Sequence, residues 1–165
     1  MENYQGEDLS GTRQFFIRDE SCPREIWKAA QMEFWVPWLM SDNYDNISCT
    51  GQTILLDGGA YHRIMFAGCS VWGSYFGKAT INYVNKDFEV IPIELTNVGE
   101  NTPFFGETPL WKGKVAKNKE NVSKFEFWGY LYAKTYDLKQ NNGIQSIQLP
   151  DYPNLHIFGI SLVEL

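Results

Sequence analysis

Alternation of apolar and polar residues is the main signal along the chain, and its period of two marks β-strands. In the runs 81–84 (Ile-Asn-Tyr-Val) and 90–95 (Val-Ile-Pro-Ile-Glu-Leu), one face is apolar and the other is mixed. Turn sequences rich in Asn, Asp and Gly separate such runs. The pattern predicts seven strands, at 51–56, 61–67, 79–84, 88–95, 124–134, 144–149 and 155–164.

The N-terminal part of the chain is less regular. Residues 1–24 are interpreted as an N-terminal arm with one strand, around the apolar run at 15–17. Residues 25–40 have a weak helical pattern, but Pro37 and the neighbouring aromatic residues favour an extended segment. A loop is predicted at 41–46. Because the 165 residues contain no repeat or linker, we expect a single domain over residues 1–165.

From residue 46 onward the chain resembles the galactose-binding-like β-jelly-roll domains. The elements that carry the resemblance are the runs at 51–56, 61–68, 79–83, 144–150 (Ile-Gln-Ser-Ile-Gln-Leu-Pro) and 154–162, which closes with His-Ile-Phe-Gly-Ile-Ser-Leu. The resemblance implies an all-β fold, a β-sandwich of jelly-roll type. The sequence departs from the family pattern at 83–87, where Tyr-Val-Asn-Lys-Asp stands in place of the Y-x-D-G-T hairpin.

The resemblance also implies a function. Domains of this kind include carbohydrate-binding modules and accessory domains of bacterial glycoside hydrolases, so it implies sugar binding, with a parent glycoside hydrolase as a candidate partner. It transfers no ligand residue to a position of this chain, because the binding loops of such domains vary.

The aromatic content predicts rings at the surface. Phe, Trp and Tyr make up 16% of the chain, more than a sandwich core built largely of aliphatic residues needs. If neighbouring strands run antiparallel, the loops at 37–50, 68–78, 96–123 and 150–154 share one end of the sandwich. The turns at 57–60, 85–87 and 135–143 then share the other end.

The first of these ends is the predicted binding site. An aromatic face covers the apolar side of a pyranose ring, while amides and carboxylates bind its hydroxyls. Trp35 and Trp128, which lie in strand-like runs, are instead expected in the core. The alternative is that the rings only plug the open end of the sandwich. The candidate ligand-binding residues are Trp72, Tyr75, Trp111, Asn101 and Tyr152.

Charge and hydropathy limit the partners. The net charge of −6 argues against nucleic acid, whose binding requires clustered cations. The lysine-rich stretch 112–124 lacks arginine and is predicted to be a solvated loop. No apolar run has the length of a membrane helix, so no membrane partner is expected. The chain is expected to be cytoplasmic, or part of a secreted protein whose signal lies outside it.

Metal and cofactor chemistry has little support in the sequence. No cofactor is expected, although Asp42 and Asp45 offer hard oxygen ligands and are candidate calcium ligands. The alternative is that they only form a turn before the next strand. His62 and His156 lie in predicted strands, where a structural role is expected, and no second histidine accompanies either.

Catalytic and disulfide signals are equally sparse. The chain contains no HExxH motif, nucleophile elbow or glycine-rich phosphate loop, so it is not predicted to be an enzyme. Three cysteines make a poor disulfide framework, although a bridge between Cys49 and Cys69 stays open.

The predicted function is a non-catalytic carbohydrate-binding module that recognises a neutral glycan through an aromatic-lined loop end. The alternative is a structural or protein-interaction β-sandwich that does not bind sugar and forms a homo-oligomer. A third hypothesis, catalysis on a small molecule inside the sandwich, requires acids or histidines clustered in a pocket.

Overall fold

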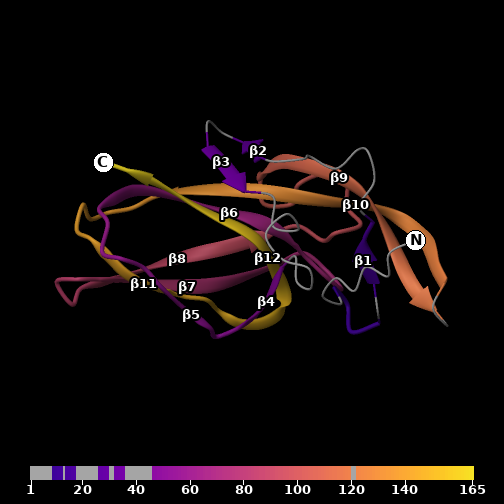
Figure 1. Ribbon diagram of the computed structural model, residues 1–165, viewed down its shortest axis with the longest axis horizontal. Coiled ribbons are helices and arrows are strands. Elements are labelled where there is room, and N and C mark those ends of the chain that lie inside the picture. The colour runs from indigo at the N-terminus through magenta and orange to yellow at the C-terminus, as the bar shows by residue number, and fades with distance from the viewer. Residues whose placement is uncertain (1–8, 13, 18–25, 30–31, 36–45, 120–121) are drawn as a thin grey trace.

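The computed structural model describes residues 9–12, 14–17, 26–29, 32–35, 46–119 and 122–165, and in these residues the chain is all-β (Figure 1). The strands pair antiparallel in three sheets. The six-stranded sheet has the order β1-β9-β10-β6-β12-β4, the four-stranded sheet the order β5-β11-β7-β8, and β2 and β3 form a separate hairpin.

The strand bounds in chain order are β1 (Gln14–Phe16), β2 (Ile26–Ala29), β3 (Met32–Trp35), β4 (Ile47–Thr50), β5 (Thr53–Leu55), β6 (Tyr61–Ser70), β7 (Tyr75–Tyr83), β8 (Phe88–Leu95), β9 (Thr108–Lys119), β10 (Val122–Asp137), β11 (Ile144–Gln148) and β12 (Asp151–Glu164). The described residues contain no helix that is long and apolar enough to span a membrane.

The six-stranded sheet separates two apolar cores, because its central strands are buried on both faces. In β6, Ile64 and Phe66 face the four-stranded sheet, while Met65, Ala67 and Cys69 face the opposite side. The first core closes the sandwich between the two sheets, with Ile81, Ile93 and Ile147 from the four-stranded sheet among its members. A strand buried on both faces is a nearly continuous apolar run, which explains why β6 lacks clear alternation.

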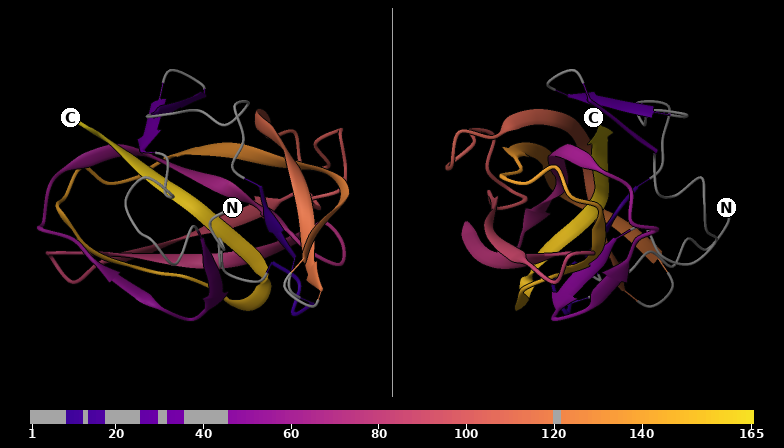
Figure 2. Two further views of the ribbon diagram at one scale, coloured as in Figure 1. Left: turned by 45° about the vertical axis from the view of Figure 1, so that its right-hand side comes forward. Right: turned by 90° about the vertical axis from the view of Figure 1, so that its left-hand side faces the viewer.

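The second core lies under the β2–β3 hairpin. Trp27 and Phe34 of the hairpin are buried there beside Leu9 and Phe16. A side chain at Gly159 would place its Cβ 2.9 Å from the Phe34 ring, so glycine allows the hairpin to approach β12. Figure 2 shows the hairpin on the far side of the six-stranded sheet from the four-stranded sheet, as a third layer over the sandwich.

The all-β fold and the β-sandwich are confirmed, and the seven predicted strands are present, six of them with shifted ends and β8 with the predicted bounds. The main error concerns 96–123, expected to be a loop, because β9 occupies Thr108–Lys119. Strand β1 lies in the N-terminal segment, at the predicted apolar run. Cys49 and Cys69 are free and buried in different cores, on opposite faces of the sheet, so no bridge joins them. Cys22 lies outside the described residues.

Candidate functional site

Three loops meet at one end of the sandwich. The turn 71–74 joins β6 to β7, the loop 96–107 follows β8, and Leu149 and Pro150 lead into β12. The backbone N–H of Val71 donates to the carbonyl of Asn154 (3.0 Å), and that of Asn97 donates to the Ser74 hydroxyl (3.0 Å). Ser70 and Asn97 also form a parallel bridge. The predicted grouping of these loops is therefore confirmed for the described residues.

The opposite end is grouped as predicted too. Ala60 and Gly143 form an antiparallel bridge. The backbone N–H of Ile144 donates to the carbonyl of Gly59, and that of Val84 donates to the carbonyl of Gly143. This end carries no tryptophan, so the loop end around residues 71–74 is the better candidate for aromatic recognition.

Trp72 is the aromatic residue of the turn 71–74. Its side chain is 67% exposed, yet its indole Nε1–H donates to the carbonyl of Ser10 (3.2 Å). Its backbone has φ = 64°, a left-handed conformation that costs a non-glycine residue roughly 1–2 kcal/mol. The turn is closed by Ser70, whose hydroxyl contacts the carbonyls of Gly73 and Leu95. The Trp72 ring is thus exposed to solvent and fixed by a hydrogen bond, in a turn with a strained backbone.

Tyr75 contacts Trp72, and Tyr152 contacts Tyr75. The Tyr75 hydroxyl donates to the carbonyl of Trp72 (3.0 Å), and the Tyr75 ring meets that of Tyr152 edge to face, with centroids 5.2 Å apart. A Cβ at Gly73 would lie 2.9 Å from the Tyr75 ring, so the turn fits closely over it. Tyr152 is exposed, at the start of β12. The structure therefore brings together Trp72, Tyr75 and Tyr152, the loop-end aromatic group.

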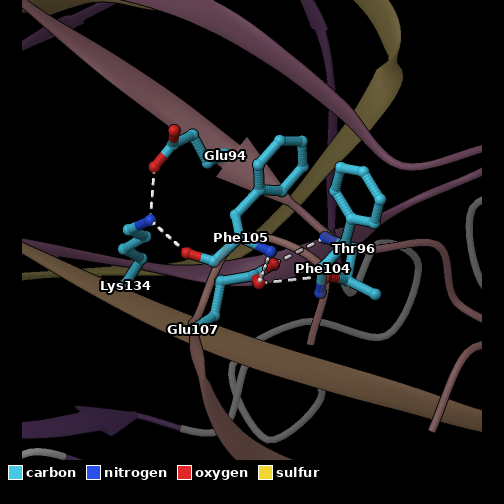
Figure 3. A network of polar contacts seen from close by, with 6 residues as sticks. All are labelled: Glu94, Thr96, Phe104, Phe105, Glu107 and Lys134. Carbon is cyan, nitrogen blue, oxygen red and sulfur yellow. Dashed lines mark hydrogen bonds and ion pairs between the residues drawn. The ribbon is translucent and has the colours of Figure 1, made fainter. Parts of the chain in front are cut away.

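The loop 96–107 is fixed by a buried carboxylate. Glu107 accepts hydrogen bonds from the Thr96 backbone N–H (2.6 Å), the Thr96 hydroxyl (2.9 Å) and the Phe105 backbone N–H (2.9 Å). The Lys134 ammonium pairs with Glu94 and donates to the carbonyl of Phe105 (Figure 3). Glu107 lies in the segment 96–123 that the sequence placed at the binding end, and its buried carboxylate fixes the shape of this loop.

The same loop carries two exposed side chains. Asn101 is exposed, and its amide oxygen accepts a hydrogen bond from the Thr102 hydroxyl (3.1 Å). Phe104 is also exposed, with its ring edge to face against Phe105. Sequence reasoning placed Phe104 at this end without selecting it, and its exposure depends on the Glu107 contacts that shape the loop.

Trp111 does not belong to this group. It lies in β9 and packs into the second core, with its ring centroid 5.1 Å from that of Phe16 and 6.1 Å from that of Trp27. Trp128, expected in the core, is instead 42% exposed on β10. The side chain of Trp35 lies outside the described residues. The polar residues beside Trp111 predicted a loop. In a strand, however, adjacent residues point to opposite faces, so these residues lie on the face of β9 opposite the Trp111 ring.

The histidines have structural contacts. His156 is buried and its Nδ1 lies 2.8 Å from the side-chain oxygen of Asn46, while His62 Nδ1 lies 3.1 Å from the carbonyl of Glu164. In the part of the chain that the structure describes, no three His, Cys, Asp or Glu side chains are grouped to hold a metal ion. The calcium candidates Asp42 and Asp45 lie outside the described residues.

These features define a β-sandwich domain with an exposed aromatic group at one loop end. The chain belongs to the AziU2-like beta-sandwich domain family, whose model matches residues 6–165. No match was found among curated proteins.

Proposed function

We propose that this domain is a non-catalytic carbohydrate-binding domain that binds a neutral glycan at its loop end. The observation that carries the proposal is the exposed ring of Trp72, tethered through its indole N–H to the carbonyl of Ser10. A ring held in place before the ligand arrives loses little conformational entropy on binding. The strained backbone at Trp72 supports a functional role, because such strain clusters at binding sites.

The neighbours of Trp72 suit a sugar. Tyr152 offers a second exposed ring, oriented by its edge-to-face contact with Tyr75. Asp151 and Thr50, which are paired between β12 and β4 next to Tyr152, are both exposed and supply hydrogen-bonding groups. Aromatic faces for C–H groups beside polar groups for hydroxyls form the combination that binds a pyranose.

The resemblance to galactose-binding-like jelly rolls adds support to this proposal. As an accessory domain of a glycoside hydrolase, the domain would bring this partner enzyme to its polysaccharide substrate. Calcium binding by Asp42 and Asp45 stays a separate prediction, and the proposed binding at Trp72 does not depend on it.

The test is a screen of neutral oligosaccharides on a glycan array, followed by calorimetric titration of each hit. Truncation Trp72→Ala is expected to weaken binding about fivefold or more, since stacking on an aromatic ring contributes about 1 kcal/mol or more. Trp128→Ala is the matched control, because Trp128 is also exposed but lies on β10. No neutral hit, or equal effects of the two truncations, would disprove the assignment.

One observation favours the alternative of a protein-interaction domain. The outer face of the four-stranded sheet exposes large apolar side chains, and such patches mark interaction sites on soluble proteins. A homo-oligomer formed through this face would dissociate on Phe88→Ser, which light scattering over a range of protein concentrations would detect. The exposed apolar residues are Leu55, Phe76, Phe88 and Val90.

A further inference from the structure

A second cluster of exposed aromatic residues lies on β9 and β10, mixed with lysines. Lys112 is directly opposite Tyr130 in the pairing of the two strands, and Lys114 is directly opposite Trp128. Alternate residues of the same strands, such as Trp111 and Leu131, enter the second core. The four side chains Lys112, Lys114, Trp128 and Tyr130 therefore share the other face; we name them the lysine–aromatic patch.

The lysine ammonium groups sit over the rings. Lys112 Nζ lies 4.7 Å from the Trp128 ring centroid and 5.6 Å from that of Tyr130. Lys114 Nζ lies 5.8 Å from the Trp128 centroid. Phe125 extends the patch, with its ring centroid 6.0 Å from that of Trp128. Attraction between cation and ring restrains the lysine side chains, so the positive charges are held in place at an aromatic surface.

The charge of Lys112 has no counter-ion among the described residues. Among the described residues, no carboxylate lies within ion-pair distance of its ammonium, whereas the ammonium of Lys134 pairs with Glu94. The nearby Glu126 accepts a hydrogen bond from the Gln14 side chain. In a chain of net charge −6, a positioned cation that no carboxylate of the described residues pairs with can attract an external anion.

The strand arrangement limits the kind of anion. Strand β9 pairs with β10 along its length and with β1 at 115–117, and β10 also pairs with β6, so the four side chains offer a ligand the face of a sheet. The net negative charge of the domain opposes a densely charged polymer such as nucleic acid. A ligand that fits must present sparse negative charges on rings that stack against Trp128 and Tyr130.

We propose that the lysine–aromatic patch is a second ligand site, for an anionic carbohydrate that carries carboxylate or sulfate groups. The anionic group pairs with the ammonium of Lys112, and the C–H face of the sugar lies on the exposed aromatic surface beside it. This proposal goes beyond the neutral-glycan site at Trp72. Figure 1 shows the paired strands β9 and β10 extending to the right of the view, and Trp128 on β10 is exposed.

The test is calorimetric titration of the full chain with tetragalacturonic acid, with its fully methyl-esterified form, and with a chondroitin sulfate tetrasaccharide. Binding of one or both acidic probes is expected, and their comparison distinguishes carboxylate from sulfate. Esterification removes the charges but keeps the rings, so it is expected to weaken binding about tenfold. Raising the salt concentration is expected to weaken binding of the acidic probes, because exposed charges are screened.

Substitutions locate the site. Lys112→Gln is expected to weaken acidic-probe binding about fivefold, and Lys112→Arg to retain it. Trp128→Ala is expected to weaken it about tenfold. Trp72→Ala is the matched control and is expected to leave it unchanged. All four side-chain changes are at exposed or half-exposed positions, and thermal unfolding followed by circular dichroism checks that each variant is folded.

Each contrary result has a definite meaning. No binding of either acidic probe at millimolar concentration overturns the proposal, as does binding that Lys112→Gln and Trp128→Ala leave intact. Loss of acidic-probe binding in Trp72→Ala alone would place the anion at the loop end and also overturn it. Failure of the neutral-glycan screen leaves this second site standing, since the two proposals use different residues and probes.

Discussion

The carboxylate of Glu107 binds both polar groups of Thr96, its backbone N–H and its hydroxyl, across the loop that follows β8. The same carboxylate accepts the backbone N–H of Phe105, while the Thr96 hydroxyl oxygen accepts that of Phe104 (2.7 Å). The buried Glu107 side chain thereby accepts hydrogen bonds from backbone N–H groups at two separate points of the loop, Thr96 and Phe105. The exposed Phe104 lies beside these contacts and is held by the hydrogen bond of its N–H to Thr96.

Glu107→Ala is therefore expected to destabilise the protein by about 3 kcal/mol, because it leaves two buried donors and one partly buried donor without an acceptor. Urea denaturation followed by tryptophan fluorescence measures the change. Glu100→Gln is the control, since that side chain is exposed and the backbone makes the hydrogen bonds of this residue: its carbonyl accepts from the Tyr132 hydroxyl and its N–H donates to the carbonyl of Asn97. Equal stability of the two variants would show that the Glu107 contacts do not hold the loop.

Gly68 is required where β6 and β12 come closest. A Cβ at Gly68 would lie 2.2 Å from the carbonyl oxygen of His156, a backbone atom that cannot move without disturbing the sheet. Gly68→Ala is expected to cost roughly 3 kcal/mol or more in unfolding free energy. Gly99→Ala, whose Cβ would meet its nearest atom at 3.4 Å, is expected to change stability by less than about 0.5 kcal/mol. Thermal and urea unfolding of both variants checks the difference.

The local pattern was sufficient to predict much of the fold. Strand β8 has the predicted bounds, because strict alternation fills it and the turn Asn85-Lys86-Asp87 precedes it. The antiparallel assumption grouped the loops correctly at both ends in the described residues. The period of the apolar pattern and the residues of the turns are local properties of the sequence. They were sufficient to predict a strand where one of its faces is buried and the other is solvated.

The exchange of roles between Trp111 and Trp128 could not be predicted from local pattern. In a strand, adjacent residues point to opposite faces, so lysines beside Trp111 are compatible with a buried ring. Strand β9 was missed because its solvated face is rich in lysine and it contains Pro109 and Gly113. Its burial depends on Phe16 and Trp27, distant in sequence, and on a third layer that no periodicity within β9 reveals.

Alkaline pH is expected to destabilise the protein. Burial, and then the nearby charge of Glu107, raise the pKa of Tyr132 from 10.0 to about 12. Because the folded state favours the neutral phenol, this contribution to stability is complete below pH 10 and is lost as the pH rises from 10 to 12. Burial also raises the pKa of Cys49, to about 12, and acts in the same direction.

Urea denaturation between pH 8 and pH 11 tests this expectation. Tyr132→Phe removes the hydroxyl that donates to the carbonyl of Glu100, so a loss of about 1 kcal/mol is expected at pH 8. The deficit is expected to shrink towards pH 11, where the wild type begins to lose the same contribution. A deficit that stays constant over this range would show that folding does not raise the pKa of Tyr132.

The strain at Trp72 predicts an unusual order of stability among its truncations. At φ = 64° a Cβ is unfavourable, so Trp72→Gly is expected to be about 1 kcal/mol more stable than Trp72→Ala. Phe76, in β7, is the control, because at an ordinary strand position the alanine variant is expected to exceed the glycine variant by about 0.5–1 kcal/mol. Urea denaturation gives both differences, and the same order at both sites would contradict a strained turn. Since both Trp72 variants lack the ring, neither is expected to bind a neutral glycan, and the more stable Trp72→Gly separates loss of the binding surface from loss of the fold.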